Sequence, residues 1–232
     1  MGALFLGLVA ALSVLTSEIA HSREPIPDMI EGVADVSDGD TLMIRGVTVR
    51  LHGIDAPETA QTCENTEGRR WSCGADAARG LVALVSNRPV RCQKAGRGTD
   101  VNGRMLGICT VGNVTINEEM VRRGLAWAFR RYAVDYVKLE DEARGRGKGI
   151  WQAPGTQTPW DYRTNAWDDA LRTSPPGKPI KGNFKRRDGV CIYHTPWSRS
   201  WRSTKINEAR GDRWFSDETE AIAAGCRAPR KR

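Results

Sequence analysis

The sequence predicts an α+β fold in two parts, and three observations lead to that prediction. Apolar residues alternate in the segment 42–51, which is typical of a β-hairpin with one buried face. Helical periodicity appears in three later segments, the first of them at residues 75–86. Three prolines within residues 173–179 then indicate a linker that separates a C-terminal segment from the rest.

The expected elements follow one another in the order three strands, a helix, two strands and two helices. The hairpin breaks at Arg45-Gly46, and a further strand is expected on each side of the Asn102-Gly103 turn. The expected segments after the hairpin are a helix at 75–86, strands at 90–94 and 104–111, and helices at 117–123 and 134–146. Residues 159–163 are expected to pack back on this domain as a clasp.

Two aspartates are expected to meet where the strands of the hairpin end. Asp38-Gly39-Asp40-Thr41 is typical of a tight turn into a strand, because glycine adopts positive φ at little cost and aspartate bonds its own turn backbone. Asp55 follows the second strand, so the two carboxylates converge. Together with a backbone carbonyl they form an oxygen site that suits Ca²⁺ or Mg²⁺. For DGDT alone, an ordinary turn beside solvated charges is the alternative.

Three ordered motifs carry a family resemblance. DGDT, RLHGIDAPE and NGRMLG together resemble the staphylococcal nuclease (thermonuclease) family over residues 30–151. The resemblance implies a five-stranded OB-fold β-barrel with three helices. It also implies dependence on Ca²⁺, hydrolysis of DNA and RNA, and products with a 3′-phosphate.

The resemblance also assigns roles to six residues. In-line attack by water on a phosphodiester builds negative charge on the non-bridging oxygens, which a cation and two guanidinium groups stabilise. Arginine suits this task because it stays charged and binds two phosphate oxygens at once. The implied roles are metal binding by Asp40, Asp55 and the carbonyl of Ala56, phosphate binding by Arg50 and Arg104, and orientation or deprotonation of the attacking water by Glu58.

Two positions depart from the family pattern. Asn102 and Arg130 stand where family members often carry tyrosine. Stacking on nucleic-acid bases would then fall to Trp127, Phe129 or Tyr132. This departure concerns sequence preference and affinity rather than the phosphoryl chemistry.

The N-terminal residues predict export. Residues 3–15 are apolar, too few to span a bilayer and the right number for the core of a signal peptide, and Ala20-His21-Ser22 supplies the small residues of a cleavage site. We therefore expect a signal peptide at residues 1–22, no membrane span after its removal, and a periplasmic or secreted bacterial protein. An uncleaved anchor and a buried helix are the alternatives.

Cysteine usage fits the same expectation. All six cysteines follow the apolar segment, and an even number fits an oxidising compartment. The simplest of the fifteen connectivities pairs neighbours in sequence, Cys63 with Cys73 and Cys92 with Cys109. Reduced, buried thiols are the alternative.

The C-terminal segment carries the net charge of the mature chain. Residues 23–177 hold 21 basic and 21 acidic side chains, whereas residues 178–232 hold 14 and 6. Interleaved aromatic residues indicate a surface for nucleic acid or an acidic cell-envelope glycan, with a solvated basic face as the alternative.

The C-terminal segment also resembles the bacterial sunset module, through IKGN, IYHTP, STKI, RWF and EAIAAG. Its usual cysteines are replaced by Lys178 and Ser216, which leaves Cys191 and Cys226 for a substitute bridge.

These inferences divide the chain into a signal peptide at 1–22, a nuclease-like OB-fold domain at 28–163, a linker at 164–178 and a small basic α+β module at 179–232. The leading hypothesis is a monomeric, exported, Ca²⁺-dependent endonuclease that prefers single strands and has little sequence specificity. Alternatives are an OB-fold module that binds nucleic acid without cutting it, or an accessory protein of exopolysaccharide (succinoglycan) biosynthesis. Paired metal carboxylates argue against a pure binder, and nothing in the residues indicates glycan chemistry.

Overall fold

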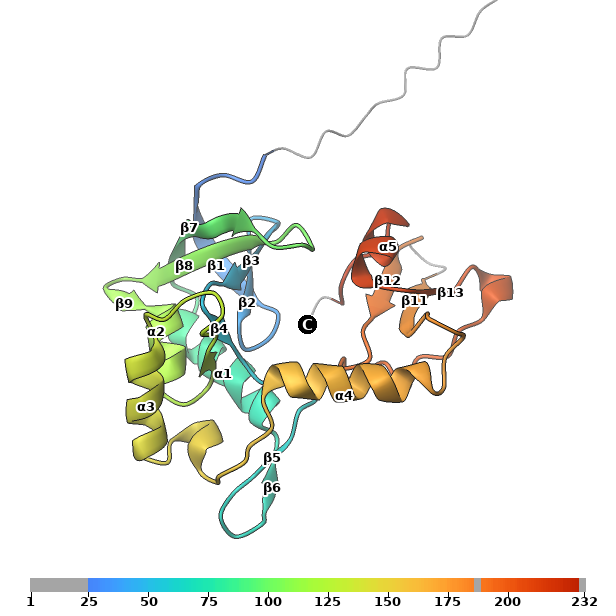
Figure 1. Ribbon diagram of the computed structural model, residues 1–232. Helices are drawn as coiled ribbons and strands as arrows, with labels where there is room; N and C mark the ends of the chain where they lie inside the picture. Colours follow the sequence, from blue (N-terminus) through green and yellow to red (C-terminus); the bar gives the residue numbers. More distant parts are fainter. Residues whose placement is uncertain (1–24, 186–188, 230–232) are drawn as a thin grey trace, which may run out of the picture.

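The protein forms a β-barrel and a smaller C-terminal module, with one long helix running along both (Figure 1). The computed structural model describes residues 25–185 and 189–229. Within these ranges no helix combines the length and apolar character needed to cross a membrane. The expected signal peptide lies outside the described residues.

Five strands close the barrel. They are β1 (Met29–Val36), β2 (Thr41–Ile44), β3 (Val47–Leu51), β7 (Pro89–Thr99) and β8 (Met105–Val111). Antiparallel pairing gives the order β3-β2-β1-β7-β8, and parallel pairing of β3 with β8 closes the ring, with Val49 opposite Met105. A short β9 (Val114–Thr115) pairs antiparallel with the end of β8. The predicted five-stranded barrel is confirmed.

The β2–β3 hairpin forms where the alternating pattern placed it. Arg45 and Gly46 take φ values of 49° and 83°, as a two-residue hairpin turn requires. Leu42 and Val49 are fully buried opposite each other, so the apolar face of the hairpin lines the core. Burial of that face fixes the register, because a one-residue slip would expose it.

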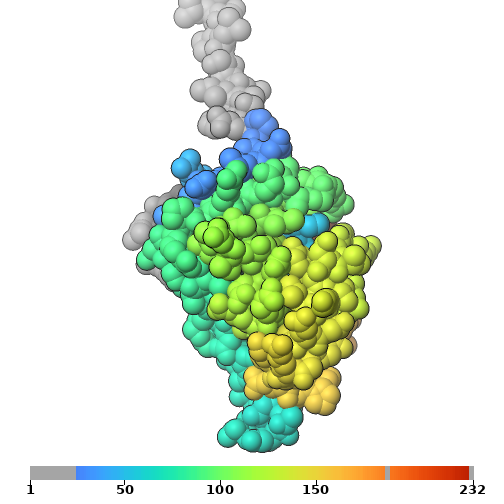
Figure 2. All heavy atoms as spheres, turned by 90° about the vertical axis from the view of Figure 1, so that its left-hand side faces the viewer, coloured from blue at the N-terminus to red at the C-terminus, as the bar shows by residue number. Residues whose placement is uncertain are grey.

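Three helices complete the barrel domain. They are α1 (Cys73–Val85), α2 (Ile116–Arg122) and α3 (Val137–Gly145), followed by the 3-10 turn η1 (Gly149–Trp151). Leu81 of α1 and Met120 of α2 are fully buried in the same core cluster as the barrel residues. Figure 2 shows the face that α2 and α3 build. The number and order of helices match the prediction, and their ends differ by up to three residues.

Local disulfides secure two loops of this domain. Cys63 and Cys73 bracket a small hairpin, β5 (Cys63–Glu64) with β6 (Arg70–Trp71), which projects from the domain in Figures 1 and 2. Cys92 and Cys109 lie opposite each other on β7 and β8 and are bonded inside the core. Both predicted pairings are confirmed.

The C-terminal module is a three-stranded sheet with one helix. Its elements are β11 (Ile180–Phe184), β12 (Cys191–His194), η2 (Glu208–Arg210), β13 (Arg213–Phe215) and α5 (Glu218–Ala223). The strand order is β12-β11-β13, and Ile180 and Phe215 are buried in a core separate from that of the barrel. The disulfide between Cys191 and Cys226 closes the module, as expected.

The connection between the two parts differs from the prediction. Residues 164–171, which the sequence analysis assigned to a linker, continue the helix α4 (Pro159–Leu171). Thr158 caps this helix by accepting a hydrogen bond from the Asp161 amide, and Pro159 occupies the first turn. Trp160 contacts the barrel domain, whereas Trp167 packs against the core of the C-terminal module. The helix therefore contacts both parts, and only the segment after it resembles a linker.

Candidate active site

Two buried aspartates meet at one end of the barrel, as predicted. Asp40 directly precedes β2, and its carbonyl accepts a hydrogen bond of 2.8 Å from the Leu51 amide at the end of β3. Asp55 lies in β4 (Ile54–Asp55), which pairs with β10 (Trp127–Ala128). The Ala56 amide donates to Asp40 Oδ2 at 2.9 Å, which ties the turn after β4 to the first aspartate. Asp40 is 4% exposed and Asp55 is 0% exposed, so neither charge is left to water.

Gly39 is needed in the DGDT turn for a different reason from the one predicted. It is absent from the glycines with positive φ. A side chain there would lie 2.6 Å from the Ala56 Cβ and 2.8 Å from the Ala77 Cβ. The turn therefore requires glycine because α1 and the Ala56 turn approach it closely.

Arg50 bridges the two aspartates. Its Nη1 lies 2.8 Å from Asp40 Oδ1 and its Nη2 lies 2.8 Å from Asp55 Oδ1. Burial alone would lower the pKa of Arg50, but Asp40 and Asp55 outweigh burial and raise it. Burial raises the pKa of Asp40, and Arg50 opposes that rise. The arrangement holds a permanently charged guanidinium group between paired carboxylates.

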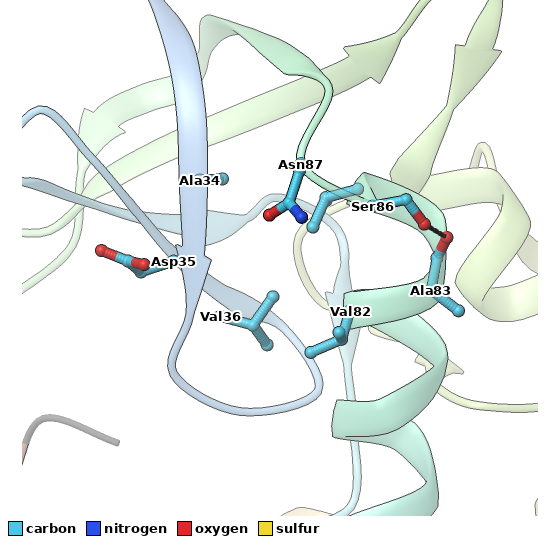
Figure 3. A pocket seen from close by; sticks show the side chains of 8 residues that line it. Ala34, Asp35, Val36, Val82, Ala83, Ser86 and Asn87 are labelled. Atoms are coloured by element: carbon cyan, nitrogen blue, oxygen red, sulfur yellow. Dashed lines mark hydrogen bonds between the residues drawn. The ribbon is translucent and has the colours of Figure 1, made fainter. Parts of the chain in front are cut away.

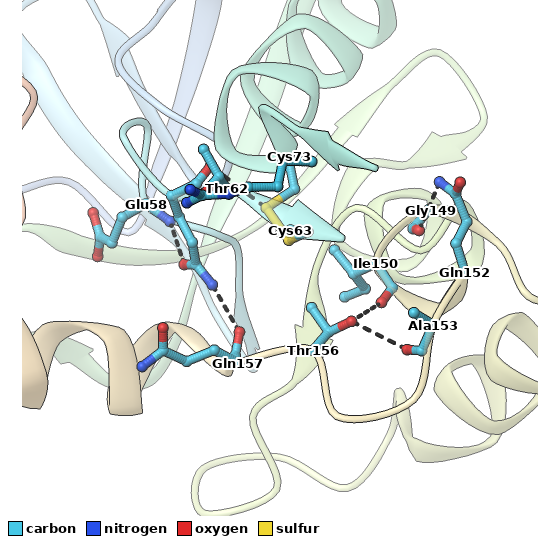
Figure 4. Close-up of a disulfide and its surroundings, with 12 residues drawn as sticks. Glu58, Thr62, Cys63, Cys73, Gly149, Ile150, Gln152, Ala153, Thr156 and Gln157 are labelled. Carbon is cyan, nitrogen blue, oxygen red and sulfur yellow. Dashed lines mark hydrogen bonds between the residues drawn. A yellow bond between two sulfur atoms is a disulfide. The ribbon is translucent and has the colours of Figure 1, made fainter. Parts of the chain in front are cut away.

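Glu58 lies beside this pair on a turn that is fixed from both sides. Its amide donates to Gln61 Oε1 at 3.2 Å, and Gln61 Nε2 donates to the Gln157 carbonyl at 2.7 Å (Figure 4). The Cys63–Cys73 disulfide follows directly after Gln61 and Thr62. Burial raises the pKa of Glu58 to about 8, against the opposing effect of Arg163. A carboxylate with this pKa is a stronger proton acceptor than an ordinary glutamate.

Arg104 lies at the periphery of the site. Parallel pairing of β3 with β8 brings the start of β8 next to Val49, one residue before Arg50. Arg104 Nε donates to Asp100 Oδ2 at 2.7 Å, and the Arg104 amide donates to Asp100 Oδ1 at 2.9 Å. Burial raises the pKa of Asp40, and the Arg104 charge is one of the effects that oppose this rise, so the guanidinium lies within electrostatic range of that aspartate. Barrel closure therefore brings Arg104 to the site, while its side chain pairs with Asp100.

The sequence of this chain is similar to those of known proteins. The family described as "Staphylococcal nuclease homologue" matches residues 48–153. An "Uncharacterized endonuclease" of Haemophilus influenzae is 33% identical over 163 residues, which cover 67% of this chain and 83% of the relative. The chain belongs to the staphylococcal nuclease family.

Two further relatives extend the comparison. A "Succinoglycan biosynthesis protein ExoI" of Rhizobium meliloti is 35% identical over 158 residues, covering 64% of this chain and 75% of the relative. A "Probable staphylococcal-like nuclease CAN2" of Oryza sativa is 30% identical over 138 residues, which is 57% of this chain but only 34% of the rice protein. The family match and the endonuclease names support a nuclease, and hence a nucleic-acid substrate.

The sequence analysis missed one member of the site, Arg163 of α4. Its Nη2 lies 2.6 Å from Asp55 Oδ2, and its Nη1 lies 3.1 Å from Asp55 Oδ1 and 2.9 Å from Glu58 Oε1. Burial opposes the charged form of Arg163, but Asp55 and Glu58 outweigh burial and raise its pKa. Arg163 lies beyond the segment that matches the nuclease family. The only sequence signal was the expected clasp at residues 159–163, which gave no role to its last residue.

Aromatic residues near the site pack mainly against one another. Trp127 is 4% exposed and contacts Trp160 at 6.4 Å between ring centroids. Phe129 stacks on Trp160 at 5.5 Å with an interplanar angle of 9°. Tyr132 is 51% exposed and meets Phe129 edge to face. Of the three aromatics expected to stack on bases, Trp127 and Phe129 help to dock α4, and Tyr132 has the most exposed ring.

The donor atoms at the site fit a hard cation. Asp40 and Asp55 supply carboxylate oxygens beside the Ala56 turn, and oxygen ligands favour Ca²⁺ or Mg²⁺ over zinc. Within residues 25–185 and 189–229 no group of three or more His, Cys, Asp or Glu side chains is arranged to hold a metal ion. A cation here would therefore rely on two carboxylates, a backbone carbonyl and water.

A shallow hollow lies elsewhere on the barrel domain, between β1 and the C-terminal end of α1 (Figure 3). Its lining residues are Ala34, Asp35, Val36, Val82, Ala83, Val85, Ser86 and Asn87. None of the six predicted site residues lines it. The carboxylate site and this hollow are separate features.

Proposed function

We propose that the protein is an exported, Ca²⁺-dependent nuclease that hydrolyses phosphodiester bonds of DNA or RNA with little sequence specificity. The observation that carries the proposal is the bridge of Arg50 between Asp40 and Asp55, beside Glu58, in a chain of the staphylococcal nuclease family. A module that only binds nucleic acid has no need of buried, paired carboxylates. The expected products carry a 3′-phosphate, as the family resemblance implies.

The side chains divide the work of in-line hydrolysis. Asp40, Asp55 and the Ala56 carbonyl would hold Ca²⁺, which supplies positive charge to the phosphate oxygens. Arg50 and Arg104 bind the non-bridging oxygens as their negative charge grows, and the fork of each guanidinium suits two oxygens at once.

Glu58 orients the attacking water and accepts its proton. Only the ionised carboxylate can accept that proton; burial raises the pKa of Glu58, and positive charge such as that of Arg163 opposes the rise and favours the ionised form. The hydrogen bonds through Gln61 fix the backbone that carries Glu58, which keeps its position relative to Asp55.

Export is supported by the cysteines. All the cysteines in the described ranges form disulfides, which fits an oxidising compartment outside the cytoplasm. Together with the expected signal peptide at residues 1–22, this favours a periplasmic or secreted enzyme. The basic C-terminal module would add affinity for polyanions, nucleic acid or an acidic glycan, through its net positive charge.

Purified protein starting at residue 23 tests the proposal on single-stranded DNA and RNA. Cleavage is expected with Ca²⁺ and is expected to stop on addition of a chelator. Glu58→Gln should lose most of the turnover while still binding DNA, whereas Glu64→Gln, an exposed glutamate of β5, should cut normally. Equal cleavage by Glu58→Gln and wild type, or full activity with zinc after chelation, would contradict the mechanism.

A second candidate function rests on one relative. The Rhizobium protein is named for succinoglycan biosynthesis, so this chain could serve exopolysaccharide production. A deletion strain complemented with wild type or with Glu58→Gln separates the two ideas. Restored polysaccharide yield with the Glu58→Gln protein would favour an accessory role that needs no hydrolysis.

A further inference from the structure

Arg163 occupies both oxygens of one metal-ligand candidate. Among the described residues, Asp55 Oδ2 accepts from Arg163 alone, and Asp55 Oδ1 accepts from both Arg50 and Arg163. The Asp55 side chain is 0% exposed, so water does not share these oxygens. Ca²⁺ binds carboxylate oxygens at about 2.3–2.6 Å. A guanidinium group that is already bonded to the Asp55 oxygens blocks this approach and repels the cation through its positive charge.

The same side chain also holds Glu58. Arg163 Nη1 lies 2.9 Å from Glu58 Oε1, while its Nη2 lies 2.6 Å from Asp55 Oδ2. One arginine thus engages the carboxylate for the cation and the carboxylate for the water together. Neither can act fully in hydrolysis while this contact persists.

Contacts at both ends of α4 keep Arg163 in place. At its start, the Gln157 carbonyl accepts from Gln61, and Trp160 stacks on Phe129 (Figure 4). Farther along, Trp167 packs against the C-terminal module and lies 6.2 Å from Trp197 between ring centroids. The Arg163 side chain is itself 24% exposed, so solvent reaches it while it holds Asp55.

The balance of charges around Arg163 predicts how its removal affects cation binding. Asp40, Asp55 and Glu58 face Arg50 and Arg163 in this cluster, so three carboxylates meet two guanidinium groups. Removal of Arg163 leaves one more uncompensated negative charge for a divalent cation. Arg50 remains paired with Asp40 and Asp55 in either case.

We propose that Arg163 is an intramolecular latch that competes with the divalent cation for Asp55 and holds Glu58 until cation and substrate displace it. This inference rests on the proposed nuclease function. It assigns α4 a regulatory contact with the site in addition to its structural role between the two parts.

Calcium affinity tests the latch without relying on activity. Isothermal titration calorimetry with CaCl₂ on the chain from residue 23, without nucleic acid, should show a Kd lower by about tenfold for Arg163→Gln than for wild type, a coupling in the usual range. Arg172→Gln is the matched control, because Arg172 is exposed just beyond the same helix and pairs only with Asp169 within the described part of the chain. Arg163→Lys keeps the charge but loses the fork, so its Kd should fall between the two. It also serves if Arg163→Gln fails to fold, which circular dichroism would show.

Other outcomes overturn the latch in distinguishable ways. An unchanged or higher Kd in Arg163→Gln and Arg163→Lys would overturn it and leave the nuclease proposal intact. Lower turnover with unchanged Kd would assign Arg163 to phosphate binding instead. Absence of Ca²⁺ binding in every protein, wild type included, would overturn the proposed metal dependence and the latch together.

Discussion

Replacement of Arg104 by lysine tests whether barrel closure places a transition-state donor at the site. Lysine keeps the positive charge but loses the planar fork that binds two phosphate oxygens. Loss of one preorganised donor costs roughly 10² to 10³ in turnover, or about 2.7–4 kcal/mol of transition-state stabilisation. We therefore expect kcat on single-stranded DNA to fall by at least about 10².

The fold should tolerate the change. Arg104 is 30% exposed and pairs with Asp100, which is 12% exposed, so solvent screens much of their attraction. A pair of this kind stabilises a protein by at most about 1 kcal/mol, which shifts the melting temperature by about 2–4 °C in a chain of this size. Binding of uncut single strands should also change little, because other basic groups contribute most of the phosphate attraction.

Three measurements on one preparation test these expectations. Rapid-quench kinetics gives kcat, binding in EDTA gives the affinity for uncut DNA, and calorimetry gives the melting temperature. Arg97→Lys is the matched control, since Arg97 is an exposed arginine on β7 of the same β7–β8 hairpin. Near wild-type cleavage by Arg104→Lys would refute the assignment of Arg104. An equal loss in Arg97→Lys would mean that the hairpin's general charge, rather than one donor, accelerates the reaction.

Three further expectations concern the rest of the chain. Truncation after Ser174 keeps α4 and should preserve hydrolysis while polyanion binding weakens, as filter binding at several salt concentrations would show; loss of both folding and cleavage would contradict a separable module. Peptide mapping without reductant should recover all three disulfides from exported protein, and free thiols throughout would oppose export. Burial and the charges of Lys181 and Lys185 lower the pKa of His194, so its contribution to stability is present above the ordinary pKa of 6.5 and is lost as pH falls below it. The melting temperature should therefore drop less between pH 7 and pH 5 in His194→Gln than in wild type, and equal drops measured by calorimetry would contradict this.

Features with a local cause could be predicted from the sequence. The β2–β3 hairpin follows from alternation around Arg45-Gly46, and the Cys63–Cys73 disulfide follows from ten residues of separation. The convergence of Asp40 and Asp55 was also expected from the hairpin, because Asp40 directly precedes β2 and Asp55 lies in β4, shortly after β3. Such features need only the covalent chain and one buried face.

Features that depend on packing across the molecule could not be predicted in this way. Gly39 is constrained by Ala56, in the turn after β4, and by Ala77, which approaches it only when α1 docks. Trp127 and Phe129 fit base stacking by residue type, but Trp160 of α4 covers that role by packing on both. A residue's type shows what it can bind, whereas its actual partner depends on which element packs against it in the fold.

Arg163 is a site residue whose position depends on packing across the molecule. It lies 105 residues beyond Glu58 and outside the segment that matches the nuclease family, so neither spacing nor family pattern pointed to it. Its position depends on the Thr158 cap, the Trp160 stack and the Trp167 contact, three independent interactions along one helix. These contacts hold a guanidinium group against buried carboxylates, which raises its pKa and keeps it charged. Because the buried Asp55 needs a positive charge beside it when no metal is bound, Arg163 stabilises the resting site, and the proposed latch requires only that this side chain leaves Asp55 while α4 stays docked.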